Sequence, residues 1–340
     1  MRGFFVRNPA FILLLLIVGF ILYAHFNSQS SIFNSQSSIS PKAANPWQTT
    51  LVHRYQSMGL SGDALGTVSA LTLGWKGDLD KGVIQSFQRS GAAHVLAVSG
   101  LHTGIVYAII VFLLTLGGRL KPLYEATWQR AIQSLCILLL LWAYAVLTGL
   151  SPSVVRSALM LTLVEIARFC SRPPLTLNIV FFSAALILAI RPADLFNVSF
   201  QLSYSAVISI VAFSSLLSSP ITNHKSPITN HQSQITKHPL WGKLGRGVFD
   251  LVWVSMAAQL GTIPFTLYYF HQLSNYFLLT NLIVLPLATI LVPLGLIVLV
   301  LGNVPYLGAG LVWCLQKGTE LMIVSVDWVQ SLPGAVVQLL

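Results

Sequence analysis

The chain has 340 residues, of which 55% are hydrophobic and only 8% are Asp, Glu, Lys or Arg. Soluble domains carry about 25% charged residues, and a soluble fold of this size could not bury so much apolar surface. The formal net charge of +10 matches the Lys and Arg that membrane proteins collect on cytoplasmic loops, with an anionic ligand as the alternative.

The apolar residues form long continuous blocks rather than short alternating strands, which excludes a transmembrane barrel. We therefore predict an all-α polytopic transmembrane protein with about eight or nine spans. The three cysteines are widely spaced and odd in number, so they indicate neither a disulfide framework nor a metal site. They are Cys136, Cys170 and Cys314.

The first apolar block runs from Ala10 to Ala24, behind Arg2 and Arg7. It resembles the core of a signal peptide, but no small-x-small cleavage site follows it. We expect an uncleaved membrane anchor over residues 1–24. Residues 25–92 are mixed and polar, contain the unit FNSQSSI twice, and are expected to form an extracytoplasmic segment.

Further apolar blocks of near-spanning length follow and make up a predicted transmembrane core at 93–335. They cover residues 95–117, 131–149, 153–170, 175–190, 195–217, 251–270, 277–301 and 307–328. The last block carries Lys317, Glu320 and Asp327, so it either spans the bilayer or lies in its interface.

Loop charges predict the orientation, because Lys and Arg collect on the cytoplasmic side. This rule places the N-terminus and the loop at 218–250 inside, and residues 25–92 outside. Heptapeptide units repeat within that inner loop at 219–239, which predicts a flexible, dispensable insertion. Copying of the unit explains the regular spacing of its histidines, so we expect no metal and no cofactor.

The most distinctive stretch is GAAHVLAVSGLHTG at 91–104. Its polar and small residues are His94, Ser99, Gly100, His102 and Gly104. Ser99 and His102 share a helix face and could form a serine nucleophile with its base, but no nearby acidic residue could orient that base. The alternative is a polar seam that packs helices closely through the two glycines. We favour a structural or pore-lining role over catalysis.

A second stretch, PSVVRSALM at 152–160, places Arg156 near the predicted outer end of a helix. An arginine within a membrane is costly and often functional, whereas snorkelling to lipid headgroups is the alternative. Glu165 lies nine residues further on, on the opposite helix face, and is expected to pair with Arg168 instead. Arg156 must therefore find its partner on another helix, in headgroups or in a substrate.

Later spans carry polar residues beside Gly or Pro, which predicts broken helices that line a cavity. These residues are Gln201 with Ser203, Gln259 with Pro264, and Asn281 with Pro286. The sequence contains no P-loop, no HExxH motif and no His-x-His-x-Asp-His cluster. We therefore expect neither a nucleotide-driven motor nor a hydrolytic metal enzyme.

These motifs resemble the ComEC competence family, the inner-membrane DNA-uptake channels of naturally transformable bacteria. Residues 91–104 resemble the family's GxxHLLAVSGLHVG, and residues 152–160 resemble PSxxRAxxM. Three later stretches follow in the family's order, at 191–203, 257–264 and 280–286. The resemblance extends over residues 64–335, without the OB-like and metallo-β-lactamase-like domains that many members carry.

The resemblance implies single-stranded DNA as a cargo that crosses the cytoplasmic membrane, with His94, His102 and Arg156 as candidate wall residues. It implies an outer-face DNA receptor or nuclease and a cytosolic ATPase or single-strand-binding protein as partners, in addition to the lipid bilayer. Homo-oligomerisation stays open. The competing functions are a small-molecule transporter, although no internal repeat of spans is visible, and an intramembrane serine hydrolase.

Overall fold

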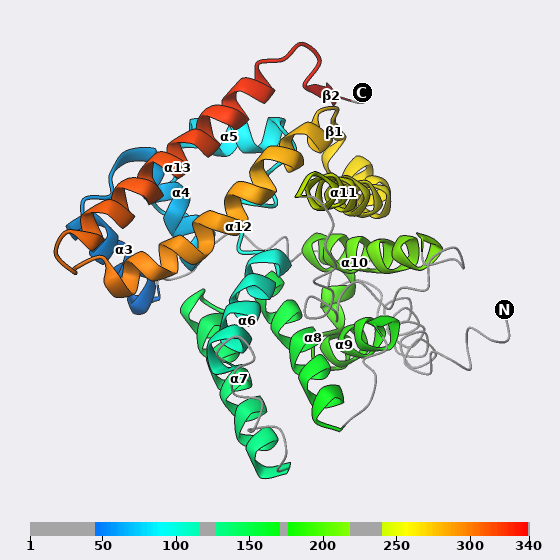
Figure 1. Cartoon of the computed structure of the whole chain (residues 1–340). Coiled ribbons are helices and arrows are strands. Elements are labelled where there is room, and N and C mark those ends of the chain that lie inside the picture. Colours follow the sequence, from blue (N-terminus) through cyan, green and yellow to red (C-terminus); the bar gives the residue numbers. More distant parts are fainter. Residues whose placement is uncertain (1–44, 116–126, 171–175, 218–239, 339–340) are drawn as a thin grey trace, which may run out of the picture.

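The computed structural model describes residues 45–115, 127–170, 176–217 and 240–338. The predicted N-terminal anchor, both copies of FNSQSSI and the heptapeptide repeats lie outside the described residues. The described chain is helical apart from one pair of short strands, which confirms the all-α prediction. Its helices form two groups, which occupy the upper left and the lower and right parts of Figure 1.

The upper group packs three short helices against an antiparallel pair of long ones (Figure 1). The helices are α3 (Pro46–Ser57), α4 (Gly62–Leu73), α5 (Lys81–Arg89), α12 (Phe277–Leu301) and α13 (Leu307–Gln330). One hydrophobic cluster contains side chains from all five. Every residue of α4 from Ala64 to Leu73 is buried, because its side chains are small or apolar and fit between neighbouring helices.

This packing changes the interpretation of the segment at 25–92. We expected a mixed, polar region ahead of a core that begins at residue 93. The part from residue 45 onward instead contributes α3, α4 and α5 to the same cluster as α12 and α13. The sequence does not reveal this arrangement, because the contacting residues are far apart along the chain. The Tyr55 hydroxyl, for example, donates to the carbonyl of Gly295 over 3.0 Å, although the two residues are 240 positions apart.

The lower group begins with three helices that run side by side, α6 (Gly100–Thr115), α7 (Thr127–Leu147) and α8 (Pro152–Phe169) (Figure 1). They have their own hydrophobic cluster. The chain continues through α9 (Thr176–Ile190), the 3₁₀ helix η3 (Pro192–Phe196), α10 (Val198–Leu217) and α11 (Leu240–Phe270). Strands β1 (Gln272–Ser274) and β2 (Val336–Gln338) then pair antiparallel, with Leu273 opposite Val337.

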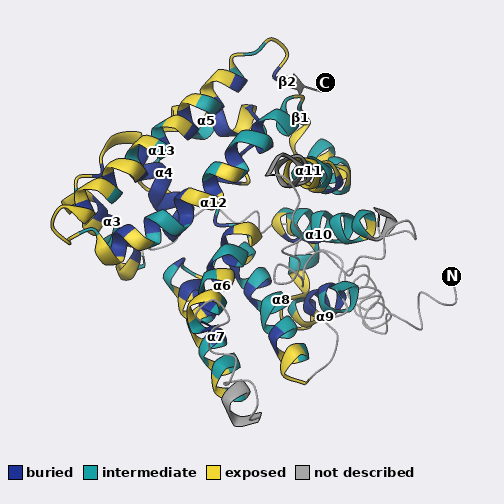
Figure 2. Cartoon of the chain, in the orientation of Figure 1, coloured by how far each residue is buried: buried dark blue, intermediate teal, exposed yellow. Residues whose placement is uncertain are grey.

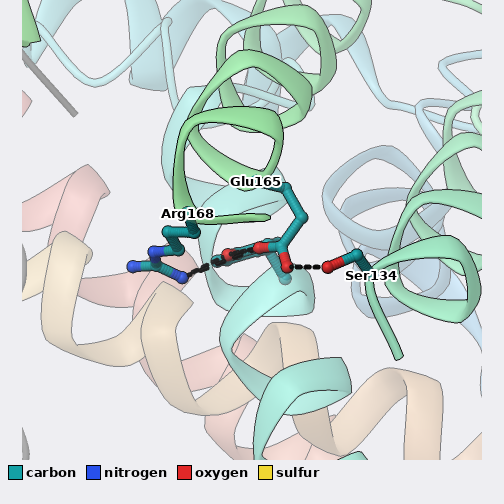
Figure 3. A network of polar contacts seen from close by, with 4 residues as sticks. Ser134, Glu165 and Arg168 are labelled. Carbon is teal, nitrogen blue, oxygen red and sulfur yellow. Dashed lines mark hydrogen bonds and ion pairs between the residues drawn. The ribbon is translucent and has the colours of Figure 1, made fainter. Parts of the chain in front are cut away.

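A network of polar contacts connects the neighbouring helices α6, α7 and α8 (Figure 3). Glu165 of α8 accepts hydrogen bonds from the Tyr107 hydroxyl of α6 at 2.8 Å and from the Ser134 hydroxyl of α7 at 2.9 Å. Arg168 lies 3.8 Å from the same carboxylate and donates to the Tyr107 oxygen at 2.6 Å. The predicted pairing of Glu165 with Arg168 is confirmed, and Tyr107 and Ser134 complete the shell of this buried carboxylate.

Many large apolar side chains are exposed, and exposed residues, coloured yellow, occur along helices of both groups (Figure 2). Two helices are long and apolar enough to cross a membrane, Gly247–Phe270 and Phe277–Leu301. The apolar helices at Gly100–Thr115, Ala131–Leu147, Thr176–Ile190 and Val198–Ser214 are shorter. Sixteen residues of helix extend about 24 Å, less than the hydrocarbon core. The expected eight or nine spans are thus not all found as full-length spans in the described residues.

The expectation of broken helices at proline is wrong for the described residues. α11 continues through Pro264, and α12 continues through both Pro286 and Pro293. Both Pro264 and Pro286 are exposed. A proline removes one backbone hydrogen bond, but packing of the flanking turns can hold the helix together across it.

Candidate functional site

The stretch at 91–104 joins the two helix groups. Ala92, Val95 and Leu96 belong to the hydrophobic cluster of the upper group, and Val98 belongs to that of α6–α8. α6 begins only at Gly100, so the expected helix from residue 95 is wrong and residues 91–99 form a loop. The loop is apolar because its side chains fill both clusters, which made it look like the start of a span.

Ser99 and His102 form the cap of α6. The backbone N–H of Ser99 donates to His102 Nδ1 at 3.0 Å, and the Ser99 Oγ lies 2.9 Å from the same nitrogen. This is the geometry of a capping box, in which a side chain three residues into the helix accepts from the N–H of the capping residue. Because Nδ1 accepts this bond, the neutral imidazole carries its proton on Nε2.

The same geometry weighs against a serine nucleophile. A catalytic imidazole needs a group on its second nitrogen that holds its tautomer and orientation. In the described part of the chain, His102 Nε2 is buried and has no hydrogen-bond partner. The pair therefore fits the interpretation as a polar structural element better than catalysis.

His94 lies in the joining loop, is exposed and acts electrostatically on His102. Desolvation by the surrounding protein lowers the pKa of His94, against a smaller opposite effect of its hydrogen bond with the backbone of Gly91. A lowered pKa favours the neutral imidazole at pH 7. It adds polarity without charge.

The two glycines of this stretch differ in their surroundings. A Cβ added at Gly100 would lie 3.0 Å from the Ser157 hydroxyl, so this glycine lets α6 approach α8 closely. A Cβ added at Gly104 would meet no atom within 4 Å. Close helix packing through Gly104 was expected and is wrong.

Arg156 finds its partner on another helix. Its Nη2 donates to the carbonyl oxygen of Ser199 at 3.0 Å and to the Ser199 hydroxyl at 2.9 Å. The side chain is 5% exposed, so it does not snorkel outward as an extended arm. Ser199 was not singled out from the sequence, since a serine at the start of an apolar helix is ordinary and nothing in its spacing points to Arg156.

The remaining predicted residues lie on α10, α11 and α12. Gln201 donates from Nε2 to the Leu195 carbonyl at 2.9 Å, and Ser203 is half-buried two residues later. Gln259 is half-buried on α11. Asn281 is buried on α12, and its Oδ1 has no partner within the described residues.

The structure joins these stretches in one series of contacts. Thr280 donates to the Ser90 carbonyl at 2.8 Å, just before the 91–104 stretch. Gly100 then faces Ser157, and Arg156 reaches Ser199. On α10, the Ser209 hydroxyl donates to the Ala257 carbonyl of α11 at 2.6 Å. Segments up to 190 positions apart in sequence, the separation of Ser90 from Thr280, are thus joined pairwise by contacts between helices in an apolar protein.

Residues 71–340 match the Competence protein family, and the chain belongs to this family. It is 31% identical over 227 residues to ComE operon protein 3 of Bacillus subtilis (strain 168), which is 67% of this chain and 25% of that protein. It is 32% identical over 136 residues to an uncharacterized protein of Aquifex aeolicus (strain VF5), 40% of this chain and 30% of that protein. The chain thus spans less than a third of these curated relatives. No solved structure matches it significantly.

Proposed function

We propose that this chain forms part of a path through which single-stranded DNA crosses the cytoplasmic membrane during natural transformation. Membership in the Competence protein family is the observation that carries the proposal. Polar side chains and backbone groups at Ser90, Ser99, Arg156 and Ser199 support it, because they bring hydrogen-bonding groups into a largely apolar helical protein.

The surface of the protein supports a position in the membrane. Leu260, Ile290 and Val300 are exposed on the two helices of spanning length, and Val300 is 73% exposed. Large exposed apolar side chains on such helices are unfavourable in water when they gather into a patch and are stabilised by lipid or by other helices. We propose a multi-pass protein of the inner membrane, in which helices shorter than a span lie against longer ones.

The chemistry of the cargo defines what the path must supply. Each nucleotide carries a phosphate charge that hydrocarbon cannot solvate, so the strand needs polar groups and water along its way. Neutral groups such as His94 and Ser99 would let the strand slide, whereas a row of cations would hold it. Aromatic side chains would stack bases in a manner that tolerates any sequence.

We further propose that the chain neither cuts DNA nor powers its movement. Hydrolysis of a phosphodiester commonly uses metal-activated water, and ATP-driven movement uses a P-loop; the sequence contains no recognisable motif for either. An outer-face receptor or nuclease and a cytosolic ATPase or single-strand-binding protein would then supply these steps.

Deletion of the gene provides the test. We expect transformation by added DNA to fall strongly in the deletion strain, and surface binding of labelled DNA to persist, because only passage is lost. A plasmid copy of the chain should restore transformation. Unchanged transformation in the deletion strain would refute the proposal and favour a small-molecule transporter, whereas metal-dependent cleavage by the purified chain would refute the non-catalytic part.

A further inference from the structure

We propose that Arg156 and the exposed start of α10 form a binding site for one phosphodiester group of a DNA strand. The oxygens of Ser199 that bond to Arg156 stand where an oxygen of the phosphate would bind. The inference rests on the proposed function, because it takes the DNA strand as the ligand. It adds a defined site, a ligand group and an exchange of hydrogen bonds.

The first argument is charge. Arg156 is 5% exposed, and among the described residues it forms no ion pair with a carboxylate. Asp194 of η3 acts on it electrostatically but lies beyond ion-pair distance. A buried guanidinium without a counter-charge is strongly unfavourable. An anion at this place would remove the penalty.

The second argument is the pattern of donors. Nη2 of Arg156 bonds to both oxygens of Ser199, whereas Nε is buried and finds no acceptor among the described residues. The hydrogens of Nε and Nη2 point along the same edge of the guanidinium, the edge that binds two oxygens of one phosphate. Ser199 satisfies one half of this edge. The two non-bridging oxygens of a phosphodiester would satisfy both halves.

The third argument is access. Ser199 is exposed, while Arg156 lies beneath it. Rotation of the Ser199 hydroxyl is a small movement, and it would free a hydrogen of Arg156 Nη2 for a phosphate oxygen while the bond to the Ser199 carbonyl is kept. The position is also the N-terminus of the 20-residue helix α10, where the Ser199 N–H bonds to Asn197 Oδ1 and the helix dipole favours an anion. The predicted topology places this end of α10 and the start of α8 together at the outer face.

A lipid headgroup offers the same phosphate chemistry, but the structure favours DNA. An arginine that serves headgroups extends its side chain to the rim of the protein. The Arg156 side chain instead turns inward to α10 and stays covered by Ser199. It belongs to the same series of contacts as the 91–104 stretch, through the neighbouring Ser157 and Gly100.

The experiment measures binding of a fluorescent thymidine oligonucleotide to the purified full chain in a phosphate-free maltoside detergent. A neutral-backbone oligonucleotide of the same sequence is the ligand control. Three variants are compared with the wild type: Arg156→Gln, Ser199→Asp and Ser199→Ala. Affinity is measured over a range of salt concentrations, because each phosphate contact contributes to the slope of log affinity against log salt.

We expect Arg156→Gln to weaken binding and to reduce the salt slope by about one phosphate contact. Ser199→Asp should do the same while keeping or raising the melting temperature, because its carboxylate fills the site from within. Ser199→Ala should keep the salt slope of the wild type and bind more tightly, since it removes the hydroxyl that competes with the phosphate for Nη2 of Arg156. The neutral-backbone oligonucleotide should show no dependence on Arg156.

An unchanged salt slope in folded Arg156→Gln would overturn the site. If that variant does not fold, Ser199→Asp decides, and unchanged binding by its folded form has the same consequence. A different outcome is that phosphatidylglycerol stabilises the purified protein only when Arg156 is present, while Arg156 has no effect on oligonucleotide binding. That result would show a lipid site and refute the proposal. If transformation is lost in the deletion strain but the salt slope does not depend on Arg156, this site alone is refuted. If transformation is unchanged in the deletion strain but the salt slope does depend on Arg156, the proposed function alone is refuted.

Discussion

At the start of α6, one imidazole nitrogen lies within hydrogen-bond distance of both the N–H and the hydroxyl of Ser99. The ring is fully buried, so the loss of this acceptor could not be compensated by bulk water. If His102 acts as a cap, the stability lost on substitution should depend on whether the new side chain can accept a hydrogen bond, and not on its size.

His102→Leu should lower the stability of the folded chain by about 1–3 kcal/mol, because it removes the acceptor of the half-buried Ser99 N–H and hydroxyl. His102→Gln should lower it less, since glutamine is a natural acceptor at this position of a capping box. Thermal unfolding of the purified protein in detergent measures both. Equal losses would contradict the capping role.

The same site tests the alternative of a serine hydrolase. We expect no covalent labelling of Ser99 by a serine-reactive fluorophosphonate, because no group orients the second nitrogen of His102. Labelling that disappears in Ser99→Ala would restore the catalytic interpretation.

Between elements, close approach of backbones decides how α10 and α11 pack. A Cβ at Gly261 of α11 would lie 2.6 Å from the Ser205 carbonyl of α10, which is backbone and cannot move aside alone. A Cβ added at Gly104 of α6 would meet no described atom within 4 Å. The sequence does not distinguish these two helical glycines, whereas the structure shows that only Gly261 lies against a neighbouring backbone.

Gly261→Ala should destabilise the protein by about 1–3 kcal/mol through forced separation of α10 and α11. Gly104→Ala is the matched control and should be neutral or stabilising by up to about 1 kcal/mol, because alanine favours helix and meets no neighbour. Melting temperatures of the two purified variants give the comparison. A larger loss for Gly104→Ala would show that the helix contacts are assigned wrongly.

The network around Glu165 makes a second prediction about elements, since it connects α6, α7 and α8 (Figure 3). Glu165→Ala removes the acceptor for Tyr107 and Ser134 and should cost about 1–3 kcal/mol of stability. Glu165→Gln keeps a carbonyl oxygen and should cost less. Melting temperatures check the order, and an Ala variant as stable as the Gln variant would show that the carboxylate does not hold the three helices.

For the whole molecule, the outstanding question is orientation in the membrane. The distribution of Lys and Arg places α5 outside and the end of α8 inside. The exposed native Cys170, directly after α8, and the exposed Gln85 of α5 are suitable reporters on the two sides.

Cys170 should resist an impermeant thiol reagent in intact spheroplasts and react after permeabilisation, in a background without Cys136 and Cys314. A cysteine introduced at Gln85, with Cys170 also replaced, should react in intact spheroplasts. Reaction of Cys170 together with protection of the Gln85 cysteine would reverse the predicted topology.

Composition, apolar blocks and motifs were enough to predict an all-α protein, its family and most of its helices. The apolar block at 277–301 coincides with α12, because a long apolar segment in lipid can pair all its backbone N–H and C=O groups only by forming a helix or a closed barrel. The pairing of Glu165 with Arg168 was also predictable, since residues three apart on a helix are neighbours.

Tertiary structure alone decided how these segments meet. The mixed composition of residues 45–92 did not show that α4 is buried, because burial depends on partners that come more than 200 positions later, such as Gly295 beside Thr72 and Tyr55. The partner of Arg156 was equally hidden, since any serine could accept its hydrogen bond and only folding brings Ser199 within 3 Å. Local patterns determine which segments are helical, whereas contacts between distant segments, and hence the site, depend on how the helices pack.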